Sequence, residues 1–529
     1  MARSPIVAFA RRLHGAAGER RMAEGRLARR EFLSGIAASV TLAGCAASGA
    51  GALPEAAALA RGRAGRRAQP RIVVVGAGLA GITCAYRLQQ AGLSSTVYEA
   101  NSRTGGRTWT LRDFFKDGQI DEHGGQLIAS THHYVRRLAG QLGLSLINLN
   151  AAYPPRAADT NYLSGERYPM HEAIADYDRY VYEPLRRAAR AAGYPTTFSR
   201  HTQAGVELDR TSVDEWINRN VEGGTQSKIG ALLLLACLDE YGGEAHLQSA
   251  LNLIYLFVGM RRGKLNLSGS GEDDRFTIAG GNDQMAARMI AALPSGTVVT
   301  GTSLEALRKN AGGSYACTFS AAGSSKSVTA DSVVLSLPFT VLRRVDTRGA
   351  AFSERKRRAI AALDLGSNAK VHLQFDSPYW FEEGYSGTAY ANRAFQGAWD
   401  TSVGQRGKAG MLVCFPGGER GTRYRGDEHG PAPAATAREY LRSLDPVLPG
   451  ASASFNGVAY QDFWIGDPFT RGAYSYYKVG QYATLAGEEH VREGNVHFCG
   501  EQTSYEWSGY MNGAVESGER AAREVLGDA

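Results

Sequence analysis

A change in the pattern of hydrophobic residues at position 71 marks the start of the folded part of the chain. Ile72–Val75 is a run of β-branched residues, which is typical of a strand buried in a parallel sheet. After a glycine-rich stretch, Ile82–Ala91 carries apolar residues at helical spacing and ends at Gly92. Ser95–Glu99 then predicts a second short strand. The order strand, loop, helix, strand predicts a βαβ unit.

The loop between the first strand and the helix has the spacing G-x-G-x-x-G. Gly76 permits a tight turn, Gly78 lets the backbone approach a pyrophosphate, and Gly81 lets the helix pack closely on the sheet. The N–H groups at the start of the helix, around Ala80, would face the phosphates together with the positive end of the helix dipole. Glu99, at the end of the second strand, is placed to accept hydrogen bonds from a ribose hydroxyl. These features together predict a dinucleotide site.

Helical patterns dominate from about residue 131 to residue 270. Apolar residues recur at helical intervals in Asp176–Ala192 and His246–Val258, and Ile229–Leu238 predicts a buried helix of about three turns. Ser212 and Glu215 have the spacing of a capping box, in which each side chain serves a free backbone N–H of a helix start.

Strand-like segments return after residue 270, and one helix closes the chain. The predicted strands are Thr297–Val299, Tyr315–Phe319, Ser332–Leu337, Lys370–Phe375, Met411–Phe415 and Asn495–Cys499, and the closing helix is Gly513–Leu526. We therefore predict an α/β fold, with a Rossmann-like nucleotide-binding domain and a discontinuous domain that combines a mixed sheet and helices. The expected boundaries are 71–130, 272–343 and 488–529 for the first domain, and 131–271 and 344–487 for the second.

Residues 1–70 have the composition of an export leader. Arg29–Leu33 matches a twin-arginine motif, and the apolar run Ile36–Ala47 behind it is too short to span a bilayer. We therefore predict export by the twin-arginine machinery, which carries folded proteins, to the periplasm or the outside of the cell. Leu42–Cys45 also matches a lipobox, so a lipid anchor at Cys45 and cleavage near Ala50 stay open as alternatives. The rest of this stretch predicts a flexible linker.

The net charge of +7 belongs to this leader. Residues 1–70 hold twelve arginines, four glutamates and no lysine, a charge of +8, which leaves −1 for residues 71–529. Nucleic acid is therefore excluded as a partner, because phosphate binding needs a basic face on the folded domain. The six cysteines show no metal-ligand spacing, so we predict no metal site and leave disulfide pairing open. No pattern indicates the oligomeric state, and a homodimer stays open.

The segment directly after Glu99 resembles the flavin amine oxidases, the family of the monoamine, polyamine and L-amino-acid oxidases. Ala100–Thr108 contains the GGR-T motif that follows the ribose-binding glutamate in that family. The resemblance implies FAD as the cofactor, bound along Ala100 and Gly106, with Arg107 donating to its pyrophosphate.

The resemblance extends over nearly the whole chain after the leader and is close at the C-terminus. Phe498–Glu501 and Trp507–Gly518 match the closing motif of the monoamine oxidases. The helix that opens near Met511 would point its N–H groups at the edge of the flavin that becomes negative on reduction. The other positions that the resemblance assigns to FAD are Gly125 and Gln126 beside the flavin ring, Val298 at the adenine, Trp464 against the flavin, and Gly500 and Glu501 near the ribityl–phosphate region.

Three positions are implied by the resemblance to carry the chemistry. Gly366–Lys370 matches the segment that holds an active-site lysine, so Lys370 is expected to hold a water against the flavin. Tyr474 and Tyr510 match paired aromatic residues that hold the substrate nitrogen before the flavin. Ala473 stands where the animal monoamine oxidases carry the cysteine bonded to the flavin, so FAD is expected to be non-covalent.

The implied reaction removes a hydride from the carbon next to a neutral amine nitrogen, hydrolyses the imine, and reduces O2 to H2O2. A primary or secondary amine is favoured as the substrate, because Leu127 stands where venom-type L-amino-acid oxidases place a carboxylate-binding arginine. An L-amino-acid oxidase stays open, since Asp121–Gly125 resembles bacterial examples, and so does a relative of tryptophan 2-monooxygenase. A dehydrogenase that reduces a carrier protein and a non-catalytic flavoprotein are further alternatives.

Overall fold

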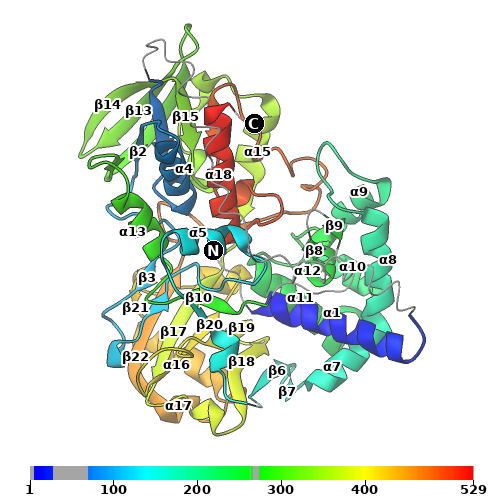
Figure 1. Ribbon diagram of the computed structural model, residues 1–529. Coiled ribbons are helices and arrows are strands. Elements are labelled where there is room, and N and C mark those ends of the chain that lie inside the picture. Colours follow the sequence, from blue (N-terminus) through cyan, green and yellow to red (C-terminus); the bar gives the residue numbers. More distant parts are fainter. Residues whose placement is uncertain (1–4, 28–68, 156, 262–263, 266–272, 528–529) are drawn as a thin grey trace, which may run out of the picture.

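The computed structural model describes residues 5–27, 69–155, 157–261, 264–265 and 273–527. Three parts can be followed in Figure 1. A parallel sheet with its helices forms the upper part of the view, a large mixed sheet the lower part, and a group of helices lies to one side. Three separate stretches of the chain, within residues 72–98, 298–335 and 496–498, contribute strands to the parallel sheet.

The first part is a five-stranded sheet in the order β11-β2-β1-β15-β24, with every pair parallel. Its strands are β1 (Ile72–Val75), β2 (Ser95–Tyr98), β11 (Val298–Val299), β15 (Ser332–Leu335) and β24 (Val496–Phe498). β1 is central and buried on both faces, which explains its run of β-branched residues. The predicted βαβ unit and the α/β fold class are confirmed.

Helices cover one face of this sheet and a second sheet covers the other. The helices α4 (Leu79–Gln90), α5 (His133–Gln141), α13 (Gln284–Ala291) and α18 (Met511–Leu526) share a core with Val74. On the other face, Val73 and Val75 pack against β12 (Thr302–Lys309), β13 (Tyr315–Ala321), β14 (Ser324–Ala330), α14 (Phe339–Leu342) and α15 (Glu354–Ala362). The valines of β1 thus alternate between two cores, as the period of two of a strand requires.

The second part is an eight-stranded sheet in the order β21-β22-β17-β20-β19-β18-β6-β7. Its strands are β6 (Ala158–Leu163), β7 (Glu166–Arg167), β17 (Ala369–Phe375), β18 (Tyr385–Ala391), β19 (Gly397–Asp400), β20 (Gly410–Phe415), β21 (His429–Pro431) and β22 (Phe455–Phe463). The apolar side chains Val371, Leu373 and Phe375 of β17 share a core with α16 (Ala434–Leu444) and α17 (Ala451–Ser454). Its polar residues alternate with them and belong to the opposite face.

Four short two-stranded sheets are separate from the sheets described above. They pair β3 (Thr110–Leu111) with β4 (Asp121–Glu122), β5 (Leu146–Asn148) with β10 (Phe276–Ile278), β8 (Met260–Arg261) with β9 (Lys264–Leu265), and β16 (Asp364–Leu365) with β23 (Ser475–Tyr476).

The third part contains the helices predicted between residues 131 and 270. They are α6 (Leu149–Ala152), α7 (Met170–Asp176), α8 (Tyr182–Ala192), α9 (Gln203–Asp209), α10 (Val213–Asn220), α11 (Lys228–Tyr241) and α12 (Ala250–Val258). The capping box of Ser212 and Glu215 is present at the start of α10. The prediction missed β5, β6 and β7 in this stretch. β6 is a strand because it pairs with β18, more than 200 residues further along the chain, and no local pattern reveals such a partner.

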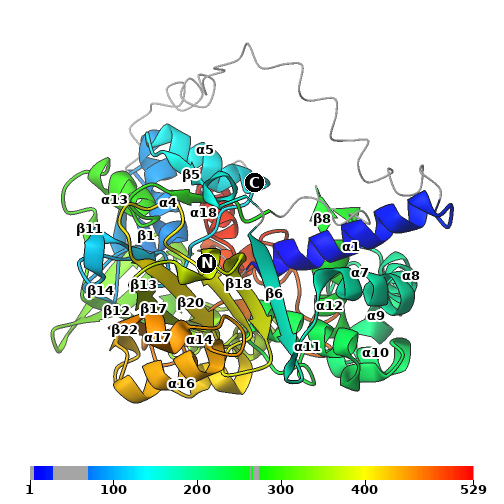
Figure 2. The same ribbon diagram turned by 90° about the horizontal axis from the view of Figure 1, so that it is seen from below.

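A helix inside the predicted leader packs into the body of the protein. α1 (Ile6–Ala23) lies between the helical part and the edge of the mixed sheet (Figures 1 and 2). Phe9 and Leu13 are fully buried, and the Phe9 ring centroid lies 4.8 Å from that of Tyr390 in β18. This helix was not predicted, because the motif at Arg29–Leu33 indicated that the residues before it belong to the leader.

The twin-arginine motif, the apolar run Ile36–Ala47 and Cys45 lie outside the described residues, so export and the lipid anchor stay predictions. Within the ranges that the structure describes, no helix has both the length and the apolar character needed to cross a membrane. The described cysteines are all buried and free, namely Cys84, Cys237, Cys317, Cys414 and Cys499.

Replacing Phe9 by alanine should lower the free energy of unfolding of the full-length protein by about 3 kcal/mol, because removal of a buried aromatic ring leaves a cavity. Urea denaturation measures the change, and Glu19→Ala on the exposed side of α1 is the control. If processing removes α1 from the working protein, the two variants and the wild type will instead unfold alike once they are purified in mature form.

Candidate functional site

A cleft at the carboxyl ends of β1 and β2 gathers most of the residues predicted to bind FAD. Those that line it are Gly76, Gly78, Ala80, Glu99, Ala100, Gly106, Arg107, Gly500, Glu501 and Met511. Both α4 and α18 begin at this cleft, so two sets of N-terminal backbone N–H groups and two positive helix-dipole ends face it. Free backbone N–H groups and positive helix-dipole ends stabilise the negative charge of a pyrophosphate. The residues of the cleft therefore fit a dinucleotide.

The three glycines of the loop do different things in the structure. Gly76 has a φ of +99°, which residues with a side chain rarely adopt. A Cβ added at Gly81 would stand 2.1 Å from the Gly76 carbonyl oxygen, whereas one added at Gly78 would meet nothing within 4 Å. Gly81 is thus required by the packing of α4, and Gly78 leaves the wall of the cleft open for a ligand.

Glu99 lies just after β2 and is held by the backbone. Its carboxylate accepts the N–H of Ala77 at 2.7 Å and the N–H of Asn101 at 2.8 Å. Burial raises the pKa of Glu99, although these N–H groups favour its charged form. Val298 lies in β11, directly beside β2. The contacts of Glu99 with ribose and of Val298 with adenine stay predictions.

Arg107 and Glu501 form an ion pair in the wall of the cleft, with Nη1 3.0 Å from Oε1. Glu501 also accepts the Ser475 hydroxyl at 2.8 Å and the Gly509 N–H at 2.7 Å. Burial raises the pKa of Glu501, but Arg107 and these donors outweigh it and hold the pKa below its usual value. Arg107 Nη1 also donates to the Ala473 carbonyl oxygen at 2.5 Å, so Glu501 and Ala473 together set the position of Arg107 at the cleft.

Lys370 lies in β17 with its ammonium group buried. Nζ donates to the Glu122 carbonyl oxygen at 2.7 Å and to Oε1 of Gln126 at 3.0 Å. Burial lowers the pKa of Lys370, against the opposing effect of nearby carboxylates. An ammonium group has three N–H donors, and the third finds no acceptor among the residues that the structure describes. Lys370 itself lines none of the described cavities, but both of its acceptors line the larger cavity described next.

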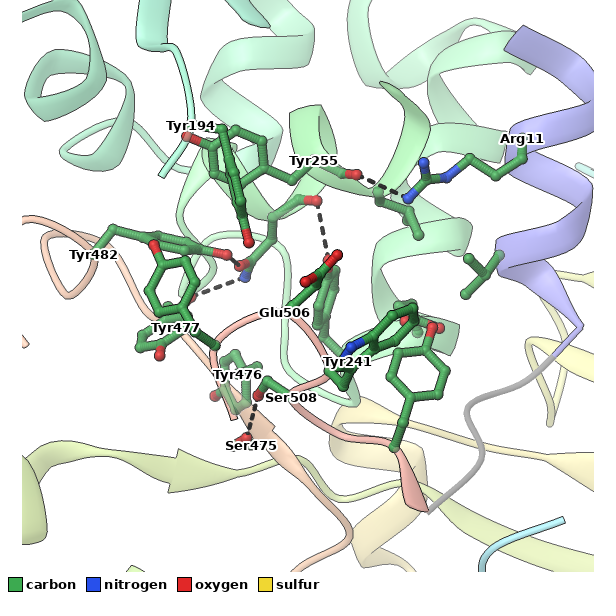
Figure 3. Close-up of a pocket in the computed structure, with 17 residues that line it drawn as sticks. Arg11, Tyr194, Tyr241, Tyr255, Ser475, Tyr476, Tyr477, Tyr482, Glu506 and Ser508 are labelled. Atoms are coloured by element: carbon green, nitrogen blue, oxygen red, sulfur yellow. Dashed lines mark hydrogen bonds between the residues drawn. The ribbon is translucent and has the colours of Figure 1, made fainter. Parts of the chain in front are cut away.

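Two cavities border these residues. One, of about 580 Å³, is lined by Glu122, Gln126 and Trp399 and is closed in part by α1. The other is rich in tyrosine, and Figure 3 shows the Arg11 side chain reaching toward it from α1. Arg11 donates to the Tyr255 carbonyl oxygen at 3.1 Å. The helix that sequence analysis placed in the leader therefore contributes to both cavities.

The predicted aromatic residues lie around the same region. Tyr510 precedes α18 and lines the tyrosine-rich cavity, while Tyr474 is buried in a cluster with Trp399 and Trp464. The Trp464 indole N–H donates to the His123 carbonyl oxygen at 3.1 Å, which places it against the loop of Gly125 and Gln126. The facing arrangement of Tyr474 and Tyr510 stays a prediction.

A set of buried histidines and aspartates beside Lys370 was not predicted from the sequence. A signal was present, because Lys370, His372 and Gln374 alternate with apolar residues in a strand that is buried throughout. Buried polar side chains require hydrogen-bond partners, so such a strand indicates polar residues facing it. His123 and His429 come close enough to Asp462 to hold a metal ion together, but Nδ1 of each ring is hydrogen-bonded to Asp462, and these bonds account for the arrangement.

Comparisons with known proteins identify the family of the chain. A family model described as flavin containing amine oxidoreductase matches residues 79–526. Putrescine oxidase from Kocuria rosea is 27% identical over 86% of this chain and 95% of its own. Flavin-containing amine oxidase A from Bos taurus is 25% identical over 86% of this chain and 84% of its own. A structure of putrescine oxidase bound to putrescine aligns with a TM-score of 0.72 at 25% identity, covering 87% of this chain and 99% of that one.

The family match begins after α1 and runs from the glycine loop to the end of α18. It therefore includes both helices that open on the cleft and the strand that carries Lys370. The chain belongs to the flavin-containing amine oxidoreductase family and is a flavin-dependent oxidoreductase.

Proposed function

We propose that this protein is an FAD-dependent oxidase that converts a primary or secondary amine to an imine and reduces O2 to H2O2. The imine hydrolyses to an aldehyde and ammonia or, from a secondary amine, to an aldehyde and a primary amine. The observation that carries the proposal is the buried Lys370 ammonium, with an N–H donor left for a bound molecule, beside the 580 Å³ cavity. A preorganised cationic donor in a buried site stabilises negative charge that develops on oxygen during its reduction.

The lining of the large cavity favours an amine over an amino acid. Its ionisable side chains are six carboxyl groups and two guanidinium groups, namely Asp121, Glu122, Asp159, Asp273, Asp274, Asp400, Arg12 and Arg406. Burial raises the pKa of Glu122 to about 8 and that of Asp400 to about 7, so the excess of negative charge rests on the other four carboxylates. An excess of carboxyl groups attracts an ammonium ion and disfavours a substrate carboxylate. The putrescine-bound relative, whose ligand is a diamine, supports the same choice.

The other steps of the proposed reaction are assigned to FAD, Tyr474, Tyr510 and Lys370. Bound FAD supplies the acceptor for the hydride that leaves the carbon next to the amine nitrogen. The resemblance to the family assigns the orientation of the amine to Tyr474 and Tyr510, whose ring faces favour its nitrogen. Tyr510 lines the tyrosine-rich cavity, so the carboxyl groups of the larger cavity attract the amine and Tyr510 orients it from the other cavity. Lys370 keeps a proton at Nζ for a bound water or O2. Ala473 is buried and has no nucleophilic atom, so FAD is held non-covalently.

A peroxide-release screen tests the proposal. Tyramine, phenethylamine and putrescine are compared with L-Phe, L-Trp and L-Lys, and ammonia is measured in the same reactions. We expect equal amounts of peroxide and ammonia from at least one amine. Turnover confined to amino acids would make the protein an amino-acid oxidase or a monooxygenase of that class. Anaerobic bleaching of the flavin by an amine without peroxide formation in air would make it a dehydrogenase.

A further inference from the structure

Asp121, His372 and Asp462 form a buried row on the face of β17 that carries Lys370. The His372 ring is 1% exposed, and its Nδ1 lies 2.8 Å from Oδ2 of Asp121 while its Nε2 lies 2.9 Å from Oδ2 of Asp462. A carboxylate only accepts hydrogen bonds, so both ring nitrogens donate and His372 is an imidazolium. Burial lowers the pKa of His372, but the two carboxylates outweigh burial and raise it above its usual value.

The far end of the row is fixed by two more histidines. Oδ1 of Asp462 accepts Nδ1–H of His123 at 2.7 Å and Nδ1–H of His429 at 2.6 Å. Nε2 of His429 lies 3.2 Å from Asp467, so His429 also stands between two carboxylates. Burial lowers the pKa of His429, yet these carboxylates raise it to about 9. Asp462 thus accepts from three rings, and a network satisfied in this way is rigid.

The near end of the row reaches Gln126. Oδ1 of Asp121 accepts from Nε2 of Gln126 at 3.3 Å. Because the amide nitrogen faces Asp121, the amide oxygen faces the other way, toward Lys370 Nζ at 3.0 Å and the Trp399 indole N–H at 3.2 Å. A flipped amide would set its N–H groups against an ammonium and an indole N–H, which are donors only. The acceptor that Lys370 needs is therefore turned toward it by Asp121.

We propose that Asp121, clamped by His372 and Asp462, is a positioning residue that orients the Gln126 amide and thereby holds the Lys370 ammonium beside the substrate cavity. The importance of this for turnover rests on the proposed oxidase function, whereas the effect on Lys370 itself does not. The charged and titratable groups that face Lys370 are Asp121 and Glu122 from β4 and Asp462 from β22. Asp121 is thus one of three carboxyl groups that favour the charged form of Lys370.

The first test observes Lys370 directly in the FAD-loaded protein. The chain has nine lysines, so a sample labelled with ¹³C at lysine Cε gives few signals, and Lys370→Met identifies the one sought. We expect Lys370 to lose its proton at a lower pH in Asp121→Asn than in the wild type. Glu524→Gln is the control, because it removes a carboxylate that pairs with His497 at 2.9 Å and Arg520 at 2.8 Å in a partly buried place away from the site. A Lys370 titration unchanged by Asp121→Asn would overturn the proposal.

The second test asks whether Asp121 acts through Gln126. We expect Asp121→Asn and Gln126→Leu each to slow the reaction of the reduced protein with O2 about tenfold, a change of about 1.4 kcal/mol in the barrier. The double variant should be no slower than Gln126→Leu alone, and additive losses would contradict the mechanism. If Asp121→Asn does not fold, Thr401→Val serves instead, because it removes only the hydroxyl that donates to Asp121 at 2.8 Å.

Two further outcomes are informative. The metal content of the purified protein is measured in the wild type and in His429→Gln. If the wild type holds one equivalent of a metal ion, and His429→Gln loses both the ion and the reactivity of the flavin, the histidines and aspartates form a metal centre and the proposal is overturned. A wild type that releases no peroxide with any amine would refute the proposed function. In that case the titration of Lys370 would still decide whether Asp121 positions it.

Discussion

Replacing Lys370 by methionine is expected to leave the protein folded and flavin-loaded but to slow its reaction with O2 about 10²-fold. The reason is the loss of a buried cationic donor at the place where negative charge develops on oxygen. Methionine has a similar length and no charge, so it removes the donor without opening a large cavity. Stopped-flow mixing of the anaerobically reduced protein with oxygenated buffer measures the rate.

The matched control for this variant is Lys408→Met, because Lys408 is exposed in the loop between β19 and β20. Anaerobic reduction by an amine, followed in the same instrument, separates the two halves of the reaction. It should change far less than reoxidation does. An unchanged rate with O2 in Lys370→Met would remove Lys370 from the chemistry and leave it a structural role.

Gly78→Ala and Gly81→Ala are expected to affect different properties of the protein, the first FAD binding and the second stability. A Cβ at Gly78 meets nothing within 4 Å, so Gly78→Ala should fold with nearly unchanged stability yet bind FAD at least tenfold more weakly, since the methyl group occupies the approach of the pyrophosphate. A Cβ at Gly81 would stand 2.1 Å from a backbone carbonyl oxygen. Gly81→Ala should therefore lose about 2 kcal/mol of unfolding free energy even without FAD, because α4 must shift.

Urea denaturation of the apoprotein and fluorescence titration with FAD separate the two effects. Gly140→Ala in α5 is the control, because its added Cβ also meets nothing within 4 Å and lies outside the cleft. It should bind FAD as the wild type does. Tight FAD binding by Gly78→Ala would show that the pyrophosphate does not pass this glycine, and the glycine loop would lose its assigned role.

Much of the nucleotide-binding part could be predicted because its signals are local. The β-branched run of β1, the spacing of Gly76, Gly78 and Gly81, and the glutamate after β2 all lie within thirty residues of one another. The close match at the C-terminus predicted a helix that begins near Met511, and the structure brings the start of that helix to the same cleft as the glycine loop. Its contact with the edge of the flavin stays a prediction.

The substrate side was less predictable because its contacts join distant segments. β6 was missed since its partner β18 lies far along the chain. Lys370 was identified, but its partners Glu122 and Gln126 come from another part of the sequence. The polar alternation in β17 could have indicated a buried network, though not which residues complete it.

The sequence by itself determined the fold class and the family, and it predicted the glycine loop and Lys370 as parts of the site, because motifs and periodicity are properties of neighbouring residues. Only the tertiary structure decided which way the Gln126 amide points, that His372 lies between two carboxylates, and that α1 contributes to the cavities. Hydrogen-bond direction and burial depend on atoms that residues hundreds of positions apart bring together, and the energy of a buried charge depends on all of them at once.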